Sequence, residues 1–207
     1  MKTCVYIDGF NLFFGALRKT PHRWLNLATL CRLMLPQNHI HQIKYFTAQV
    51  KPRPHDPQQP IRQQIYLRAL ATLPNVTIIY GHYLSHTVKM PLANPPAQGP
   101  KYVDVIKTEE KGSDVNLATH LLCDAFRNVF EVAVVVSNDS DLVEPIRIVK
   151  EELHKKVGVL NPHQHPSRAL TTHATFLKQI RAGVLAVSQF ADELHDGHGR
   201  FRKPEGW

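Results

Sequence analysis

The amino-acid sequence predicts an α/β fold, with a parallel sheet flanked by helices in a single domain. Short apolar runs rich in β-branched residues alternate along the chain with segments of helical periodicity, which is typical of such a sheet. The run at residues 132–136 is apolar throughout, as in a parallel strand buried on both faces. With 207 residues, of which 43% are hydrophobic, the chain is long enough to bury one sizeable core.

The first half of the chain predicts strands and helices in turn. The apolar run 4–7 stops at an Asp-Gly pair, which marks a turn at the end of a strand. Asn26 is a suitable N-cap for the helical spacing that follows, and four prolines within residues 51–60 exclude regular structure there. We expect strands at 4–7, 43–50 and 76–84, and helices at 12–17, 27–34 and 61–73.

The second half begins with a break. Three prolines and a Gly-Pro pair make residues 85–100 a loop or an arm, and from residue 192 the chain is polar and glycine-rich, as in a frayed tail. Between them we expect strands at 102–106, 132–136 and 156–160, and helices at 113–127, 140–153 and 170–190. The predicted domain therefore covers residues 1–182, and residues 183–207 are expected to be a helix end and a flexible tail.

Composition favours an anionic partner. The formal net charge of +8 and the pI of about 9.5 favour nucleic acid, but a generally basic surface has the same signature. Three cysteines lie in separate apolar runs without a C-x-x-C pair, so buried thiols are expected rather than zinc ligands. There is neither a signal-peptide pattern nor a run of about 18 apolar residues, which predicts a cytoplasmic location and no membrane contact.

Carboxylates are concentrated at junctions between apolar runs and helices. Asp8 follows the first predicted strand, Asp114 opens a predicted helix, and Asp139 and Asp141 follow the most apolar strand. In parallel α/β sheets, ligands bind beyond the carboxyl ends of the strands, so these acids are expected to converge. Each also has a structural alternative, because aspartates are common in turns, as N-caps and in the first turn of a helix.

Two neighbouring glutamates are less clear. In the functional interpretation, one of Glu109 and Glu110 reaches the acidic site while the other pairs with Lys111; an ordinary surface role is slightly favoured for both. Asp124 is ten residues beyond Asp114, which turns it roughly 80° around an ideal helix. We therefore expect Asp124 at the surface and not as a partner of Asp114.

An oxygen-rich, thiol-free set of ligands suits Mg²⁺ or Mn²⁺. Two such ions, about 4 Å apart, generate hydroxide and stabilise the leaving oxygen in an in-line displacement at phosphorus. The sequence has no G-x-x-x-x-G-K-[ST] motif and no G-x-S-x-G motif, which disfavours a P-loop NTPase and an α/β-hydrolase. The residues thus indicate a metal-dependent phosphodiesterase.

Three segments together resemble the signature motifs of the NYN domain, the LabA-like branch of the PIN-domain nuclease superfamily. They are residues 6–11 (YIDGFN), 111–115 (KGSDV) and 137–141 (SNDSD), and the resemblance extends over roughly residues 2–182. It implies a Rossmann-like, PIN-like sheet and ribonuclease activity, with an endonuclease favoured. Relatives often carry an acid in the segment aligned with residues 172–176, where this chain has His173 and Thr175.

The resemblance also implies roles for individual residues. Asp8, Asp114, Asp139 and Asp141 would be the catalytic and metal-binding carboxylates. The supporting residues would be Asn11, Ser137, Asn138 and Glu110.

An RNA substrate, single-stranded or structured, needs cations for its phosphates. The candidate contacts are Lys51, Arg53, His55, Lys89, Lys101, Lys107 and Lys111, although solvated basic loops are equally typical. The main alternative function is an RNA-binding or regulatory PIN-like module with little or no catalysis. A homodimer formed through the apolar residues 177–190 also remains open.

Overall fold

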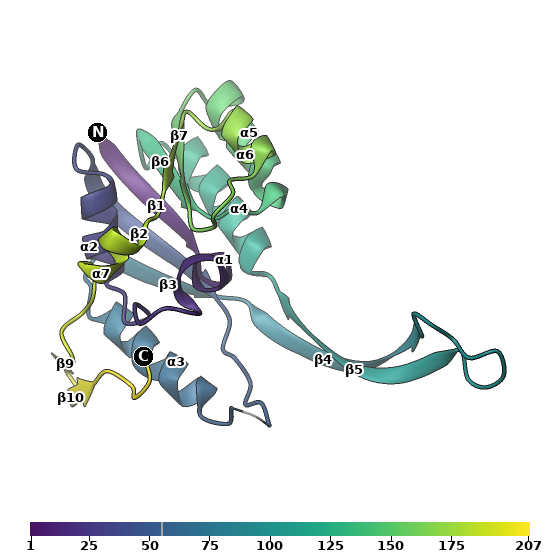
Figure 1. Ribbon diagram of the computed structural model, residues 1–207. Coiled ribbons are helices and arrows are strands. Elements are labelled where there is room, and N and C mark those ends of the chain that lie inside the picture. The colour runs from purple at the N-terminus through teal and green to yellow at the C-terminus, as the bar shows by residue number, and fades with distance from the viewer. Residues whose placement is uncertain (55) are drawn as a thin grey trace.

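Six strands form a central sheet in which every neighbouring pair is parallel (Figure 1). The computed structural model describes residues 1–54 and 56–207, so the expected phosphate contact His55 lies outside the described residues. In spatial order, the strands are β3 (Val76–Tyr80), β2 (His39–Thr47), β1 (Lys2–Asp8), β6 (Val132–Val136), β7 (Lys156–Asn161) and β8 (Phe176–Gln179). When only the six strands of this sheet are counted along the chain, their spatial order is 3-2-1-4-5-6, which is the order of a Rossmann-type sheet. The predicted α/β fold is therefore confirmed.

Helices cover both faces of the sheet, so the strands of its centre are buried on two sides. Successive residues of β1 alternate between two hydrophobic clusters: Val5 and Ile7 belong to one, Cys4 and Tyr6 to the other. This period of two explains why β1 and β6 read as uninterrupted apolar runs.

The Val5 side is covered by α1 (Gly9–Leu12), the π-helical turn η1 (Phe13–Leu17), α2 (Leu27–Met34), α3 (Gln59–Ala71) and α7 (Ala182–Ala186). The Tyr6 side is covered by α4 (Ser113–Phe126), η2 (Ser140–Leu142), α5 (Val143–Arg147), η3 (Ile148–Glu152) and α6 (Arg168–His173).

The chain reverses its winding direction between β1 and β6. After β1, Leu12 of α1 packs into the Val5-side cluster, whereas Ile146 of α5, which follows β6, packs into the Tyr6-side cluster. The carboxyl ends of β1 and β6 therefore lie side by side where the flanking helices diverge to opposite faces. Such a switch point is where open α/β sheets bind their ligands.

A two-stranded arm extends away from the sheet (Figure 1). It consists of β4 (His82–Pro91) and β5 (Tyr102–Lys111), paired antiparallel along their whole length. The prediction of an arm is confirmed, but the strand expected at residues 76–84 is divided: β3 ends at Tyr80 and the arm begins at His82. Pro91 does not prevent strand pairing because it is the last residue of β4, where a missing N–H is tolerated.

The C-terminal region differs from the expectation. Residues 170–190 do not form one helix, because β8 separates α6 from α7 and adds to the edge of the sheet beside β7. Beyond them, β9 (Glu193–Asp196) and β10 (Gly199–Arg202) form a hairpin in place of the expected frayed tail.

The hairpin is held by α3, which is more than one hundred residues away in sequence. Arg68 forms a salt bridge of 2.7 Å with Asp196, and its guanidinium lies 4.2 Å from the centre of the Phe201 ring. The ring of Trp207 lies 5.4 Å from that of Tyr66. Sequence pattern alone gives no sign of these distant contacts, so the tail prediction was wrong for residues 193–202.

A buried ion pair ties α4 to the sheet. The Lys44 ammonium on β2 lies 2.5 Å from the Asp124 carboxylate, which also accepts a 2.7 Å hydrogen bond from the Tyr6 hydroxyl on β1. Asp124 is only 6% exposed, so its predicted surface position was wrong. The angle around the helix correctly predicted that Asp124 does not face the same way as Asp114. It could not show that Lys44 of the sheet lies against Asp124.

Three smaller expectations can be compared with the structure. Cys4 and Cys31 are buried as expected, whereas Cys123 is exposed. Among the helices that the structure describes, none combines the length and the apolar character that a membrane span requires. Leu185 and Phe190, in the apolar segment considered for a dimer, are buried in the core of this chain.

Candidate functional site

Asp8 occupies the floor of the candidate site. It is the last residue of β1, is 4% exposed, and accepts a 2.9 Å hydrogen bond from the backbone N–H of Asn11 and a 3.0 Å bond from the Ser137 hydroxyl. Gly9 follows it because a Cβ there would lie 2.7 Å from the Phe46 carbonyl oxygen and from the Tyr45 ring. The Asp-Gly pair thus turns the chain where the neighbouring strand β2 approaches most closely.

The loop after β6 is joined directly to the loop after β1. The Asn11 side-chain oxygen accepts a 2.9 Å bond from the backbone N–H of Asn138, while the Ser137 hydroxyl accepts one of 3.1 Å from the N–H of Asp139. Asn11, Ser137 and Asn138 therefore hold the two loops together, as the supporting role predicted for them requires. Asn138 also donates a 3.0 Å bond to the His165 carbonyl, which extends the contact to the loop after β7.

Asp139 has two roles that sequence analysis treated as alternatives. One carboxylate oxygen caps η2 by accepting a 3.0 Å bond from the backbone N–H of Asp141. The same side chain lies close enough to Asp8 and Asp114 to raise the pKa of both. Capping therefore fixes the position of this acid and does not remove it from the site.

The start of α4 brings a further acid to the same edge. Gly112 has φ of 96°, a left-handed conformation that only glycine adopts at little cost, and it turns the chain from the arm into α4. Glu110 accepts hydrogen bonds from the backbone N–H and the hydroxyl of Ser113, at 3.1 and 2.7 Å. Asp114 stands in the first turn. Glu109, in contrast, pairs with Lys107 and Lys111, so Glu110 is the glutamate that accompanies the acidic cluster.

The acidic cluster, which we define as Asp8, Glu110, Asp114, Asp139 and Asp141, is electrostatically frustrated. The pKa of Asp8 is raised to about 6, mainly by burial and also by the nearby charges of Asp114 and Asp139, which together outweigh the lowering effect of its hydrogen bonds. Burial also raises the pKa of Asp114, as do the charges of Asp139, Glu110 and Asp141. Two of the five carboxyls thus resist ionisation when no cation is present.

The cluster has donor chemistry suited to a hard divalent cation, since all of its candidate ligands are carboxylate oxygens. Among residues 1–54 and 56–207, no three histidine, cysteine or acidic side chains are grouped closely enough to hold one ion together. Mg²⁺ commonly keeps several waters and binds through only one or two carboxylates. Together with the mutual repulsion described above, the donor set therefore fits such an ion.

Replacing Asp8 by asparagine is expected to stabilise the metal-free protein at neutral pH. Because folding raises the pKa of this carboxyl to about 6, its contribution to stability is fully present below about pH 4 and is lost as the pH rises through 6. An asparagine has no charge to bury, so Asp8→Asn should gain roughly 1 to 3 kcal/mol at pH 7.5.

Urea unfolding in EDTA between pH 4 and 8 measures this gain. It should vanish below pH 4, and the exposed Asp192→Asn variant should show no gain at any pH. An Asp8→Asn protein that is less stable than the wild type at pH 7.5 would contradict the electrostatic frustration of the cluster.

The position that relatives often fill with an acid lies away from this site. Thr175 directly precedes β8, and its hydroxyl bonds to the backbone N–H of Val157 at the start of β7. Since the strands are parallel, both residues lie at the amino edge of the sheet, opposite to the acidic cluster. His173 lies 3.6 Å from Glu151. At the carboxyl edge, β7 and β8 instead end in Asn161 and Gln179, joined by a 2.7 Å hydrogen bond.

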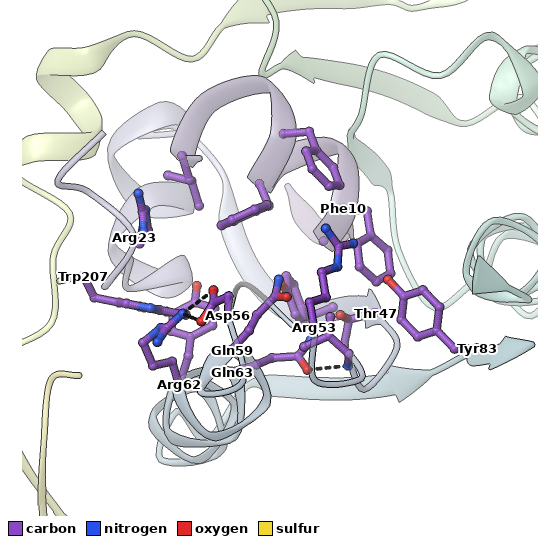
Figure 2. A pocket seen from close by; sticks show the side chains of 17 residues that line it. Phe10, Arg23, Thr47, Arg53, Asp56, Gln59, Arg62, Gln63, Tyr83 and Trp207 are labelled. Atoms are coloured by element: carbon purple, nitrogen blue, oxygen red, sulfur yellow. Dashed lines mark hydrogen bonds and ion pairs between the residues drawn. The ribbon is translucent and has the colours of Figure 1, made fainter. Parts of the chain in front are cut away.

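Sequence analysis missed an aromatic cavity of about 130 Å³, whose lining side chains are shown in Figure 2. Gly9 and Phe10 form part of its wall. The other lining residues are Phe13, Phe14, Leu17, Arg23, Tyr45, Thr47, Val50, Arg53, Asp56, Gln59, Arg62, Gln63, Tyr66, Tyr83 and Trp207. They come from segments spread over the whole chain, so only the tertiary structure assembles them.

The predicted phosphate contacts fall into three places. Arg53 lines the aromatic cavity, and Lys51 lies two residues before it. Lys107 and Lys111 belong to the part of β5 where both pair with Glu109. The remaining two, Lys89 and Lys101, belong to the outer part of the arm (Figure 1).

A Rossmann-type parallel sheet with acids converging at its switch point defines a PIN-like α/β domain. The model of the NYN domain family matches residues 2–179, and the chain belongs to this family.

Two further similarities place the chain among known proteins. It is 28% identical, over 236 aligned residues, to 6-hydroxy-3-succinoylpyridine 3-monooxygenase HspA of Pseudomonas putida (strain DSM 28022 / S16); the alignment covers all of this chain and 75% of the relative. A crystal structure of a protein of unknown function from Vibrio parahaemolyticus RIMD 2210633 is similar with a TM-score of 0.57, at 15% identity, over 87% of this chain and 93% of that one. The second similarity shows the fold alone.

Proposed function

We propose that this protein is a metal-dependent ribonuclease that cleaves RNA internally. The observation that carries the proposal is the convergence of Asp8, Asp114 and Asp139 at the switch point of a basic protein, where the charge of Asp139 raises the pKa of both other carboxyls. Packed acids are unfavourable for a protein that only binds phosphates, because they repel them. A divalent cation offsets that repulsion and turns the cluster into a phosphate-binding site.

Different residues of the chain would hold the ion and orient its ligands. Asp8 at the end of β1 and Asp139 in the loop after β6 would hold the ion, and Asp114 and Asp141 would be available to it directly or through water. Ser137 and Asn11 fix the orientation of Asp8 and of the neighbouring loop. When bound, Mg²⁺ or Mn²⁺ supplies positive charge to the reacting phosphate and lowers the pKa of its bound water.

Cleavage of a total-RNA pool in Mn²⁺, Mg²⁺ or EDTA tests the proposal. We expect fragments with either ion and intact RNA in EDTA. Internal cutting is distinguished by a circular RNA, which an exonuclease leaves intact. Uncut RNA in every buffer, with the protein bound to it, would support the alternative of a regulatory RNA-binding module.

Replacing Lys51 and Arg53 together by glutamine should weaken RNA binding and reduce its salt dependence. Each phosphate contact on a single strand contributes a slope of about −0.7 in log K against log salt, so the slope should become shallower by about 1.4. Binding of a fluorescent oligonucleotide to metal-free protein at several salt concentrations measures it. Lys2→Gln with Lys156→Gln is the matched control, since these residues begin β1 and β7 at the opposite edge of the sheet. Equal slopes for the two double variants would remove residues 51 and 53 from the RNA site.

The named relative brings a second candidate, the oxygenation of a small aromatic compound. The observation that favours it is the aromatic cavity, in which Arg53 is available to an anionic group. Oxygen consumption with 6-hydroxy-3-succinoylpyridine and a nicotinamide reductant tests this candidate. An oxygen trace that stays flat, with the compound unchanged, would dismiss it.

A further inference from the structure

The wall of the aromatic cavity adjoins residues of the acidic cluster at two points. Gly9, in its wall, follows Asp8 directly. Tyr83, also in its wall, pairs with Glu110 across the base of the arm, and the Glu110 charge contributes to raising the pKa of Tyr83. Residues that adjoin the acidic cluster thus also form part of the cavity wall.

The volume of the cavity is close to that needed for a single six-membered ring. A dry protein cavity of about 150 Å³ accommodates benzene, and this one measures about 130 Å³. A single six-membered ring matches this volume, whereas a two-ring purine would extend out of the open side of the cavity.

The walls are suited to a flat, polar ring. In the cavity wall, Phe10 and Tyr83 pack edge to face, with ring centres 6.0 Å apart and planes at 85°. Aromatic side chains of this kind stack nucleic acid bases regardless of their sequence. Between the two ends of the cavity lies the side chain of Gln59, an amide that both donates and accepts hydrogen bonds (Figure 2).

The Arg53 guanidinium supplies a positive charge beside these two aromatic rings. Figure 2 shows the Arg53 side chain beside Phe10 and Tyr83, and the Arg53 charge acts on the Tyr83 hydroxyl by lowering its pKa, against the larger effect of burial. No carboxylate of the described residues forms an ion pair with Arg53, whereas Arg62, which also lines the cavity, is paired with Asp56 at 2.6 Å. Arg53 is thus placed to contact a phosphate attached to the ring that enters the cavity.

We propose that the aromatic cavity binds the pyrimidine base of the nucleotide next to the scissile phosphate in single-stranded RNA. The proposal rests on the proposed ribonuclease function. The base stacks on the face of the Tyr83 ring and meets Phe10 edge-on, its polar edge meets Gln59, and its phosphate contacts Arg53. RNA cleavage by this protein then depends on a pyrimidine beside the cut, and the base must be unpaired because the cavity admits it alone.

Binding of mononucleotides to the metal-free protein tests the cavity without any cleavage. Isothermal titration calorimetry should show saturable binding of CMP and UMP and at least about tenfold weaker binding of AMP and GMP. Tyr83→Ala should weaken CMP binding about tenfold or more, the usual cost of a lost stacking partner. Gln59→Trp, which fills the cavity instead of enlarging it, should abolish binding, and Tyr102→Ala at the outer end of β5 should not change it.

Cleavage of homopolymers separates this proposal from the function on which it rests. We expect poly(C) and poly(U) to be cut at least about tenfold faster than poly(A) in Mg²⁺ or Mn²⁺, with the preference lost in Tyr83→Ala. Metal-dependent cleavage of all three at equal rates, unaffected by Tyr83→Ala, would overturn the pyrimidine site and leave the ribonuclease intact. CMP binding that is lost in Gln59→Trp, without cleavage of any RNA, would support the cavity and overturn the ribonuclease.

Two binding results would overturn the proposal outright. Equal binding of AMP and CMP would show that the cavity does not select one ring. Binding of a single-ring acid such as nicotinate, without binding of any nucleotide, would assign the cavity to a small aromatic acid.

Discussion

Asp139→Asn is expected to lower metal-dependent RNA cleavage by at least about a hundredfold while the protein stays folded. Even residues that only orient a metal ligand cost about 10- to 100-fold when replaced, and Asp139 is itself a candidate ligand. Asparagine keeps the oxygen that caps η2 by accepting from the N–H of Asp141, so the local structure has no reason to change. What is lost is one negative charge at the acidic cluster.

The measurement is the initial rate of RNA cleavage in Mn²⁺, accompanied by the unfolding temperature and by calorimetric titration of Mn²⁺. Asp192→Asn, the same chemical change at an exposed position before β9, is the matched control and should behave as the wild type. An Asp139→Asn protein with unchanged cleavage and Mn²⁺ affinity would exclude this residue from the site. Lost cleavage with a lowered unfolding temperature would mean that the cap was damaged, and Asp8→Asn would then decide the assignment.

Asp124→Ala is expected to destabilise the protein by about 3–5 kcal/mol, the usual cost of removing one member of a buried ion pair. The Lys44 ammonium would remain buried with only His120, 3.3 Å away, and the Tyr6 hydroxyl would lose its acceptor. For a chain of this size, the unfolding temperature should fall by roughly 10 °C. Cleavage should fall with it near that temperature, because Asp124 ties α4, which carries Asp114, to β2 through Lys44 and to β1, which ends in Asp8, through the Tyr6 hydroxyl.

The control is the double variant Lys44→Met with Asp124→Leu. Replacing a buried pair by apolar residues of similar size is often neutral or stabilising, so the double variant should recover most of the lost stability. Asp192→Ala accounts for the general effect of an aspartate truncation. If Asp124→Ala unfolds within 1–2 °C of the wild type, roughly the effect of a surface substitution, the pair does not contribute to the stability of this fold.

The local sequence pattern was sufficient to predict those strands, helices and caps that are specified by residues within one short segment. The β-branched run at 132–136, the Asn26 cap and the helix that opens at Ser113 all lie where the sequence predicts them. The acids predicted for the site also converge, because the carboxyl ends of parallel strands must share one edge of the sheet. Alternation of strands with helices implies that parallel arrangement before any contact is known.

Local pattern failed where a distant partner decides the structure. The segment after residue 192 is polar and rich in glycine, yet it forms a hairpin because Arg68 of α3 supplies both an ion pair and a surface for Phe201. Residues 176–179 leave a helical pattern to pair with β7. In both cases, the free energy of a long-range contact outweighs a weak local preference.

In the candidate site, too, some features follow from the local sequence and others depend on contacts between distant residues. The identity of its carboxylates follows from residue type and position along the alternating elements, since a β-strand that ends in Asp-Gly places its acid at the sheet edge wherever the sheet forms. The raised pKa of Asp8, the burial of Asp124 against Lys44 and the cavity beside Gly9 depend on side chains from strands, helices and the C-terminus meeting in space. Desolvation and packing are properties of the assembled neighbourhood, so only the tertiary structure decides them.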